Sequence, residues 1–139
     1  MKGRTMADLQ IGDFAEHAKT ISECDVYLFA GVTGDLNPAH INAQAAAQTM
    51  FKDRIAHGML SAGLVSAVLG MQLPGPGTIY LSQTLKFTAP VKFGDTITAR
   101  AEVIDRNVDR NRITLKTTCT NQDGKVVLDG EAVVMPPKA

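Results

Sequence analysis

The sequence lacks an excess of charge of either sign. Its 139 residues include 14 lysines and arginines and 14 aspartates and glutamates, so the formal net charge is zero. Domains that bind nucleic acid carry a basic patch, and segments that bind acidic membranes carry clusters of lysine and arginine. The balanced composition therefore predicts no nucleic acid and no membrane surface among the partners.

Long apolar runs and paired cysteines are also missing. No stretch approaches the roughly 18 apolar residues of a membrane span. The charged start, residues 1–6, leads into polar residues and not into the apolar segment of a secretory signal. Cys24 and Cys119 have no CxxC or metal-binding spacing. We expect a cytoplasmic protein with two reduced, partly buried thiols, while the spacing leaves a disulfide between them open.

The first third of the chain predicts short elements around a loop. Residues 14–21 alternate weakly, which favours a short strand. Ser22 stands three residues before Asp25, a capping-box spacing that predicts a helix from there through about Val32. Residues 42–50 are rich in alanine and glutamine and predict another short helix.

Residues 57–73 predict the most apolar helix of the chain. Apolar side chains cover nearly its full circumference, a pattern typical of a buried helix. Small residues, among them Gly63, Ser66 and Gly70, keep the helix thin enough for a sheet to pack closely around it. The run Pro74-Gly75-Pro76-Gly77 then ends it.

After residue 78 the hydrophobic period changes to two. Alternation over residues 79–88, 96–103, 113–120 and 127–134 predicts four strands, joined by turn-forming residues. Consecutive strands with one polar face form an antiparallel sheet. With no linker in the sequence, residues 1–139 are expected to form a single α+β domain in which one sheet covers one apolar helix.

The segment Gly34-Asp35-Leu36-Asn37-Pro38-Ala39-His40 combines a carboxylate, an amide and an imidazole within six positions. Pro38 fixes its own φ and pushes Asn37 toward an extended conformation, which places Asp35 and His40 on a short rigid loop. A carboxylate beside an imidazole can hold and activate a water molecule. The same residues also suit an Asx turn that caps the next helix, and spacing alone leaves both interpretations open.

The start of the apolar helix, His57-Gly58, is a second candidate site. The first amides of a helix lack internal partners and carry a partial positive charge, and glycine lets another group approach its N–H closely. The Gly58 amide could therefore polarise a carbonyl as an oxyanion hole does. The alternative is that His57 only caps the helix and Gly58 only relieves packing. Ser66 either bonds back to a carbonyl four residues earlier or contributes to substrate binding.

These motifs resemble those of the MaoC-like, (R)-specific enoyl-CoA hydratases. The motif of that family is an aromatic residue, a short spacer, Gly-Asp-x-Asn-Pro-x-His and a small residue six positions after the histidine. Here the corresponding residues are Phe29, Thr33, Gly34, Asp35, Asn37, Pro38, His40 and Ala46. The His57-Gly58-Met59 segment also looks like the short single-domain members associated with polyhydroxyalkanoate supply. Ala39 departs from the family, which often has a branched aliphatic residue there.

The resemblance implies a hot-dog fold, an antiparallel sheet wrapped around a long central helix, and a homodimer with a tunnel for the substrate. It implies reversible addition of water to trans-2-enoyl-CoA, giving (R)-3-hydroxyacyl-CoA, with no cofactor and no metal. Asp35 and His40 would bind the water, with Asp35 as the main base. Gly58 would bond the thioester oxygen through its N–H, Asn37 would brace the loop, and Ser66 would line the pocket.

Two alternatives share the fold or the ligand. A hot-dog acyl-CoA thioesterase would place a carboxylate on or beside the central helix, and residues 59–73 contain no aspartate or glutamate. A non-catalytic acyl-CoA-binding module would keep the tunnel, but it would not need both Asp35 and His40. Lys52 and Arg54 are candidates for binding the CoA phosphates by position alone.

Overall fold

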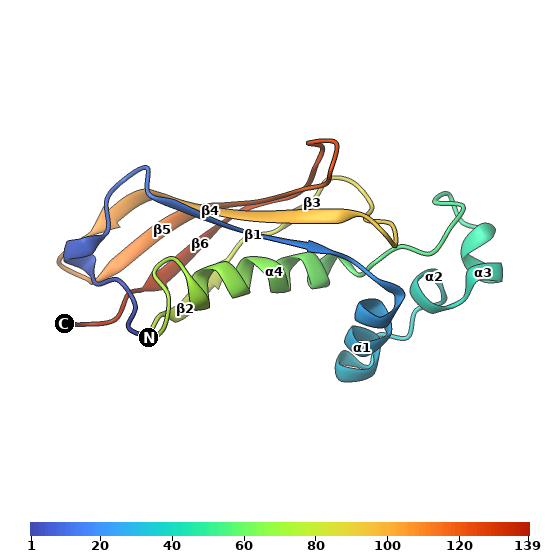
Figure 1. Ribbon diagram of the computed structural model, residues 1–139, viewed down its shortest axis with the longest axis horizontal. Coiled ribbons are helices and arrows are strands. Elements are labelled where there is room, and N and C mark those ends of the chain that lie inside the picture. Colours follow the sequence, from blue (N-terminus) through green and yellow to red (C-terminus); the bar gives the residue numbers. More distant parts are fainter.

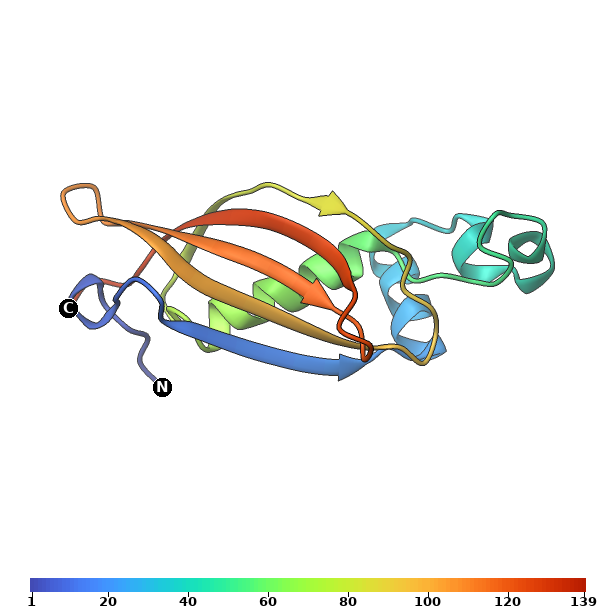
Figure 2. The ribbon, with the colours of Figure 1, turned by 90° about the horizontal axis from the view of Figure 1, so that it is seen from above.

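One antiparallel sheet and one long helix form the two layers of the computed structural model, which describes residues 1–139 (Figure 1). The strands follow the order β1-β4-β5-β6-β2, and β3 also pairs with β6. Seen from above, α4 runs beneath the sheet while α1, α2 and α3 extend beyond one of its ends (Figure 2). The predicted hot-dog fold is confirmed. In chain order the elements are η1 (Met6–Asp8), β1 (Phe14–Thr20), α1 (Glu23–Thr33), α2 (Pro38–Ile41), α3 (Ala43–Ala47), α4 (Gly58–Met71), β2 (Ile79–Gln83), β3 (Lys86–Phe87), β4 (Thr96–Asn107), β5 (Arg112–Thr120) and β6 (Val126–Met135).

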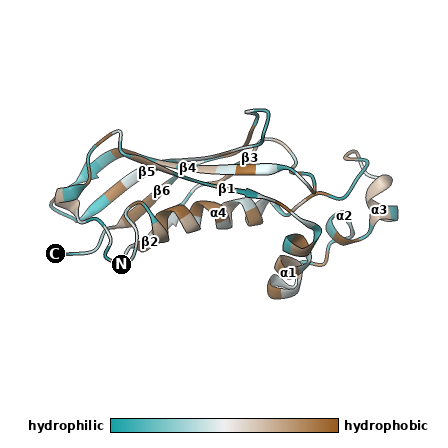
Figure 3. Ribbon diagram, viewed as in Figure 1, coloured by the Kyte–Doolittle hydropathy of each residue, from teal (hydrophilic) through white to brown (hydrophobic).

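The central helix α4 buries one face against the sheet. Hydrophobic residues recur along its whole length (Figure 3), and Leu64, Val68 and Leu69 belong to the same core cluster as the inward-facing residues of β4, β5 and β6. Met59 and Met71, however, are 53% and 60% exposed. The prediction that this helix is buried all round is therefore wrong for the single chain, because the sheet covers only the side that faces it.

The strand predicted over residues 79–88 is divided in two. Strand β2 ends at Gln83 and β3 begins at Lys86, and both pair with β6. Between them the Thr84 amide donates to the carbonyl of Glu131 at 2.9 Å. A Cβ on Gly130 would overlap the carbonyl oxygen of Thr84, so the glycine permits this close crossing. The chain therefore bends where alternation alone predicts a continuous strand.

Residues 21–57, which we call the overhang, begin and end their helices with local caps. The Ser22 capping box is formed, with Asp25 bonding back to the Ser22 amide. Helix α1 ends at Gly34, whose φ of 81° is left-handed. Asn37 caps α2, and Pro38 occupies its first turn. Helices as short as α2 and α3 are not stable alone, so their position depends on contacts with the rest of the chain.

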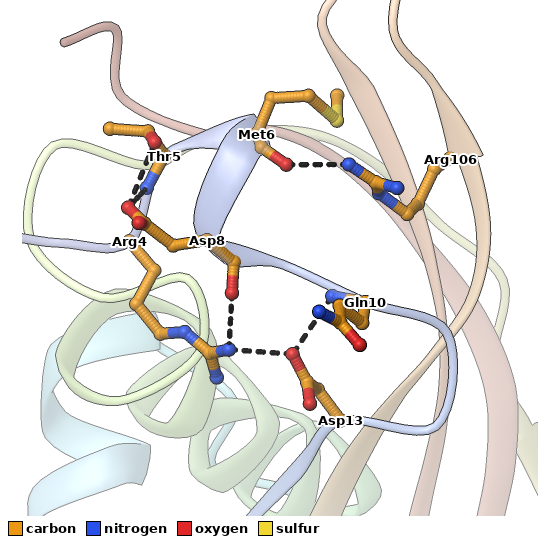
Figure 4. Close-up of polar contacts among 7 residues, drawn as sticks. All are labelled: Arg4, Thr5, Met6, Asp8, Gln10, Asp13 and Arg106. Atoms are coloured by element: carbon orange, nitrogen blue, oxygen red, sulfur yellow. Dashed lines mark hydrogen bonds and ion pairs between the residues drawn. The ribbon is translucent and has the colours of Figure 1, made fainter.

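A polar cluster at the opposite end of the molecule holds the N-terminal segment on the sheet (Figure 4). The Arg4 guanidinium donates to the carbonyl of Asp8 and pairs with the carboxylate of Asp13 at 2.6 Å. The Gln10 amide and Arg4 together lower the pKa of Asp13. The guanidinium of Arg106, from β4, donates to the carbonyl of Met6 at 2.7 Å. This end of the fold is closed by structural contacts.

Two expectations about the chain as a whole can be compared with the structure. No helix has both the length and the apolar character needed to cross a bilayer. Cys24 is exposed, Cys119 is buried, and both are free thiols. The disulfide that the spacing left open is therefore not formed, and only Cys119 has the expected burial.

Candidate active site

The overhang brings Asp35 and His40 together with a third group, His57. Asp35 lies on the loop between α1 and α2, His40 lies on α2, and His57 immediately precedes α4. One polar atom from each side chain lies within 4.8 Å of the others. Sequence reasoning predicted the first two residues and assigned His57 only to a possible cap. The His57 side chain makes no capping hydrogen bond.

The loop around Asp35 forms turns and still leaves a carboxylate oxygen free. The Asp35 amide donates to Thr33 Oγ1 at 3.1 Å, and Asp35 Oδ1 accepts from the Asn37 amide at 3.2 Å. Asn37 Oδ1 in turn accepts from the Ala39 amide at 3.0 Å. Asp35 Oδ2 accepts no hydrogen bond, and the side chain is 53% exposed. The two interpretations of this motif are therefore compatible: turn chemistry shapes the loop and presents an accessible carboxylate.

A backbone carbonyl fixes the orientation of the His40 ring. His40 Nδ1 lies 2.7 Å from the carbonyl oxygen of Ile55. A carbonyl oxygen can only accept, so Nδ1 carries the hydrogen, and in the neutral ring the lone pair is at Nε2. His40 Nε2 makes no hydrogen bond within the chain. It is therefore the atom that can accept a proton from water or substrate.

His57 is buried behind the other two residues. Its side chain is 3% exposed, and its ring stacks on that of His40 with centroids 3.8 Å apart and planes 30° apart. The Phe29 ring also packs against the His57 ring, with the two centroids 4.8 Å apart. His57 Nε2 lies 2.9 Å from the backbone carbonyl oxygen of Asp35 and 4.0 Å from Asp35 Oδ2. Its Nδ1 is buried without a hydrogen-bond partner.

The same three side chains are the group most able to hold a metal ion. Two of the three are already oriented for hydrogen bonding. His57 Nε2 donates its hydrogen to the carbonyl of Asp35, and a metal could use this nitrogen only after breaking that bond. The arrangement as it stands supplies a free carboxylate oxygen and a free imidazole nitrogen, which is a site for binding water.

Gly58, the first residue of α4, lies against an aromatic ring. A Cβ at this position would lie 2.7 Å from Cδ1 and Cε1 of Phe87. The predicted packing role of Gly58 thus has a specific cause, which is compatible with a role for its amide. Gly58, Ser61 and Phe87 line a cavity of about 320 Å³. Ser61 Oγ is buried there without a hydrogen-bond partner.

Ser66 lines a different cavity, of about 330 Å³, between α4 and β2. Its other walls include Phe29, Met59, Tyr80 and Gln83. Phe29 also contacts His57, so this cavity begins beside the histidine pair. The structure therefore places the two predicted substrate-binding residues, Gly58 and Ser66, in neighbouring but separate hollows.

The two basic residues suggested for the CoA phosphates differ in their surroundings. The Arg54 guanidinium pairs with the Glu23 carboxylate at 2.7 Å and donates to the Tyr27 hydroxyl at 2.8 Å. The hydrogen bond to Glu23 is the main cause of its raised pKa. Arg54 thus ties the overhang together, whereas Lys52 is exposed.

Comparisons with known proteins show which family and which enzymes this chain is similar to. The profile of the family described as MaoC like domain matches residues 11–124. The chain is 58% identical over 130 residues to the (R)-specific enoyl-CoA hydratase of Rhodospirillum rubrum, covering 94% of this chain and 90% of that protein. It is 51% identical over 131 residues to a 3-hydroxybutyryl-CoA dehydratase of Methylorubrum extorquens, covering 94% and 83%.

Solved structures give the same result for the fold. R-hydratase PhaJ1 from Pseudomonas aeruginosa superposes with a TM-score of 0.94 at 50% identity, covering 99% of this chain and 88% of that one. The (R)-hydratase of A. caviae involved in PHA biosynthesis superposes with a TM-score of 0.90 at 43% identity, covering 93% and 98%. The similarity thus includes both the overhang and the sheet.

Proposed function

The chain belongs to the MaoC-like domain family, and we propose that it is an (R)-specific enoyl-CoA hydratase. The reaction is the reversible addition of water to trans-2-enoyl-CoA, giving (R)-3-hydroxyacyl-CoA. The observation that carries the proposal is that polar atoms of Asp35 and His40 lie within 4.8 Å of each other. Asp35 Oδ2 and His40 Nε2 both lack a hydrogen-bond partner within the chain. The names of the similar enzymes, hydratase and dehydratase, describe the two directions of this reaction.

The mechanism uses one water molecule held between Asp35 Oδ2 and His40 Nε2. Asp35 removes a proton from the water as the water oxygen attacks Cβ of the enoyl group. His40 orients the water and shares the proton transfer. The electrons of the double bond move toward the thioester, whose oxygen accepts a hydrogen bond from the Gly58 amide. The acid–base pair of Asp35 and His40 then returns the proton taken from the water to Cα on the same face, which completes the addition. Asn37 supports this step by holding the loop through its bond to the Ala39 amide.

We assign the acyl chain to the cavity lined by Ser66. That cavity is mostly apolar, and one wall, Phe29, packs on the buried histidine of the site. An acyl chain extending from the reacting carbons can enter it without leaving the α4 surface. Its polar lining residues, Ser66 and Gln83, lie farther along α4 and β2.

We also propose that two chains pair as a homodimer. β2 is an edge strand of the sheet, and the exposed Met59 of α4 lines a cavity together with Tyr80 and Gln83 of β2. Leu81 on β2 is exposed as well. An unpaired strand edge beside exposed apolar side chains favours association with a second copy. Sedimentation of the protein and of Leu81→Asp tests this, and a wild-type monomer at micromolar concentration would contradict it.

The free thiols favour a reducing compartment, such as the cytoplasm. Cys24 is exposed and unpaired, and disulfides form readily in oxidising compartments. Fractionation of cells that produce the protein tests this assignment. Recovery of the enzyme outside the cytoplasmic fraction would contradict it.

A single assay separates hydratase from thioesterase. Crotonyl-CoA is incubated with the protein while loss of the enoyl thioester absorbance and release of free thiol are followed together. We expect the absorbance to fall without thiol release, and chiral analysis to give the (R)-3-hydroxyacyl product. Thiol release with the double bond intact would establish the thioesterase alternative. Binding of enoyl-CoAs of several lengths without turnover would establish the non-catalytic alternative.

A further inference from the structure

We propose that His57 is a positioning residue that holds Asp35 and His40 in register with the Gly58 amide. This inference rests on the proposed hydratase activity and extends it to a residue outside the reacting groups. Three contacts of one buried ring carry the argument: a hydrogen bond, a stacking contact and a covalent link to Gly58.

The hydrogen bond fixes the backbone at Asp35. His57 Nε2 donates to the Asp35 carbonyl at 2.9 Å, across 22 residues of sequence. The loop that carries Asp35 otherwise bonds mainly to itself, through Thr33, Asn37 and Ala39. The bond from His57 is therefore the contact that attaches this loop to the start of α4.

The stacking contact fixes the plane of His40. The His57 and His40 centroids are 3.8 Å apart, and their planes differ by 30°. His40 Nδ1 is held by the carbonyl of Ile55, and a ring held at one atom can still rock about that bond. The face of His57 limits this motion, so the ring of His40 keeps its orientation beside Asp35.

The peptide bond between His57 and Gly58 connects Asp35 and His40, through the His57 ring, to the amide proposed to bind the thioester oxygen. His57 is the N-cap residue of α4, and the next N–H is that of Gly58. A movement of the His57 ring relative to its backbone would change the distance between the acid–base pair and this amide. A misplacement of about 1 Å in an active site can cost about 10²-fold in rate.

Burial separates this role from direct catalysis. The His57 side chain is 3% exposed, so it does not touch the substrate. Its Nδ1 is buried without a partner, an exception that is rare in folded proteins and marks a constraint other than stability. A leucine or phenylalanine at position 57 would fill the same space and leave no buried nitrogen unpaired. It would, however, lose the hydrogen bond from Nε2 to the Asp35 carbonyl, and this bond is the constraint that favours histidine.

The test compares two substitutions at position 57 with a control at another histidine. His57→Phe keeps an aromatic ring for stacking and removes the donor, whereas His57→Gln keeps an N–H donor and removes the ring. His17, half-buried on β1 away from the site, gives the control His17→Phe. We expect kcat for crotonyl-CoA to fall about 10–100-fold in His57→Phe, with KM changed less than about twofold. His57→Gln should recover part of this loss, and His17→Phe should match the wild type.

A spectroscopic measurement keeps the inference testable without a variant. Imidazole ¹⁵N chemical shifts of the wild-type protein should show His57 as the Nε2–H tautomer and His40 with hydrogen on Nδ1. An Nδ1–H tautomer of His57 would overturn the inference, as would an unchanged kcat in a folded His57→Phe or a change confined to KM. If His57→Phe does not fold, the tautomer of His57 in the wild-type protein decides alone, and the Nδ1–H form would overturn the inference. A wild-type protein that hydrates no enoyl-CoA would instead overturn the proposed function.

Discussion

Replacing Gly58 with alanine tests whether α4 must begin with a residue that has no side chain. The new Cβ would lie 2.7 Å from two ring carbons of Phe87. Non-bonded carbons pack at about 3.5–4.0 Å, so the ring and the helix must separate by about 1 Å. Phe87 is 51% exposed on the two-residue strand β3, whereas Leu60 and Ser61 in the same turn of α4 are buried. We therefore expect the ring to move and the helix to stay.

The displaced ring should affect activity more than stability. Because Phe87 is half-exposed before and after, we expect the free energy of unfolding to change by less than about 1 kcal/mol. That corresponds to a shift in Tm of at most about 4 °C for a domain of this size. Gly58 and Phe87 line the same cavity, so the methyl and the ring together crowd the Gly58 amide. Loss of an oxyanion donor costs about 10²–10³ in kcat, and we expect a fall near the lower end.

A double-mutant cycle identifies the cause of the loss. Crotonyl-CoA hydration is measured by absorbance for the wild type, Gly58→Ala, Phe87→Ala and the double variant. Removing the ring should restore at least about tenfold of the activity lost in Gly58→Ala, because the two substitutions act on one contact and are not additive. Full activity in Gly58→Ala would refute the reasoning about the amide. A double variant as slow as Gly58→Ala would refute the ring as the cause.

Three further predictions concern other parts of the chain. Asp35→Asn keeps the loop's hydrogen-bond acceptor but cannot take up a proton, so kcat should fall about 10²–10⁴-fold while thermal unfolding by circular dichroism stays near that of the wild type; full activity would end the assignment of Asp35. Burial raises the pKa of Cys119 to about 12, so a chromogenic disulfide at pH 8 should detect only Cys24 until the protein is unfolded, and two fast thiols in the native state would contradict this burial. The Ser22 amide and hydroxyl lower the pKa of Asp25, so the stability from this carboxylate is present above its unfolded pKa of about 3.9 and is lost as the pH falls through its lower folded pKa. Asp25→Asn should therefore destabilise the protein to urea at pH 7, with a difference that disappears in acid; a difference constant with pH would contradict the linkage.

The features that sequence predicts well are those decided within a few residues. The Ser22 capping box follows from two side chains three positions apart, and the end of α1 follows from the left-handed glycine at position 34. The Asn37 cap is equally local, because its side-chain oxygen accepts from the Ala39 amide. The helix predicted over residues 42–50 corresponds to α3, whereas α2 is not predicted as a helix. The alternating segments after residue 78 become β4, β5 and β6 because period-two patterns need no knowledge of the partner strand.

The features that sequence does not predict depend on distant pairing. His57 reaches His40 because Ile55 bridges to Lys92 and the Ala56 amide donates to the carbonyl of Val91 at 2.7 Å. These partners lie about 35 residues later in the chain, and no local pattern encodes them. The same limit explains the wrong prediction that α4 is buried all round, because an apolar circumference does not indicate which side of the helix the sheet covers. It also explains the break between β2 and β3, which depends on Gly130 of another strand.

Both imidazoles of the site are oriented by main-chain oxygens, at Ile55 for His40 and at Asp35 for His57. Substituting the side chain at either of these positions leaves the acceptor atom in place. The size of the side chain at residue 55 can therefore vary without removing the acceptor that orients His40. In the same way, the carboxylate at residue 35 can be replaced without removing the acceptor that orients His57. In this loop, the identity of the reacting side chain and the orientation of the two imidazole rings therefore depend on different atoms.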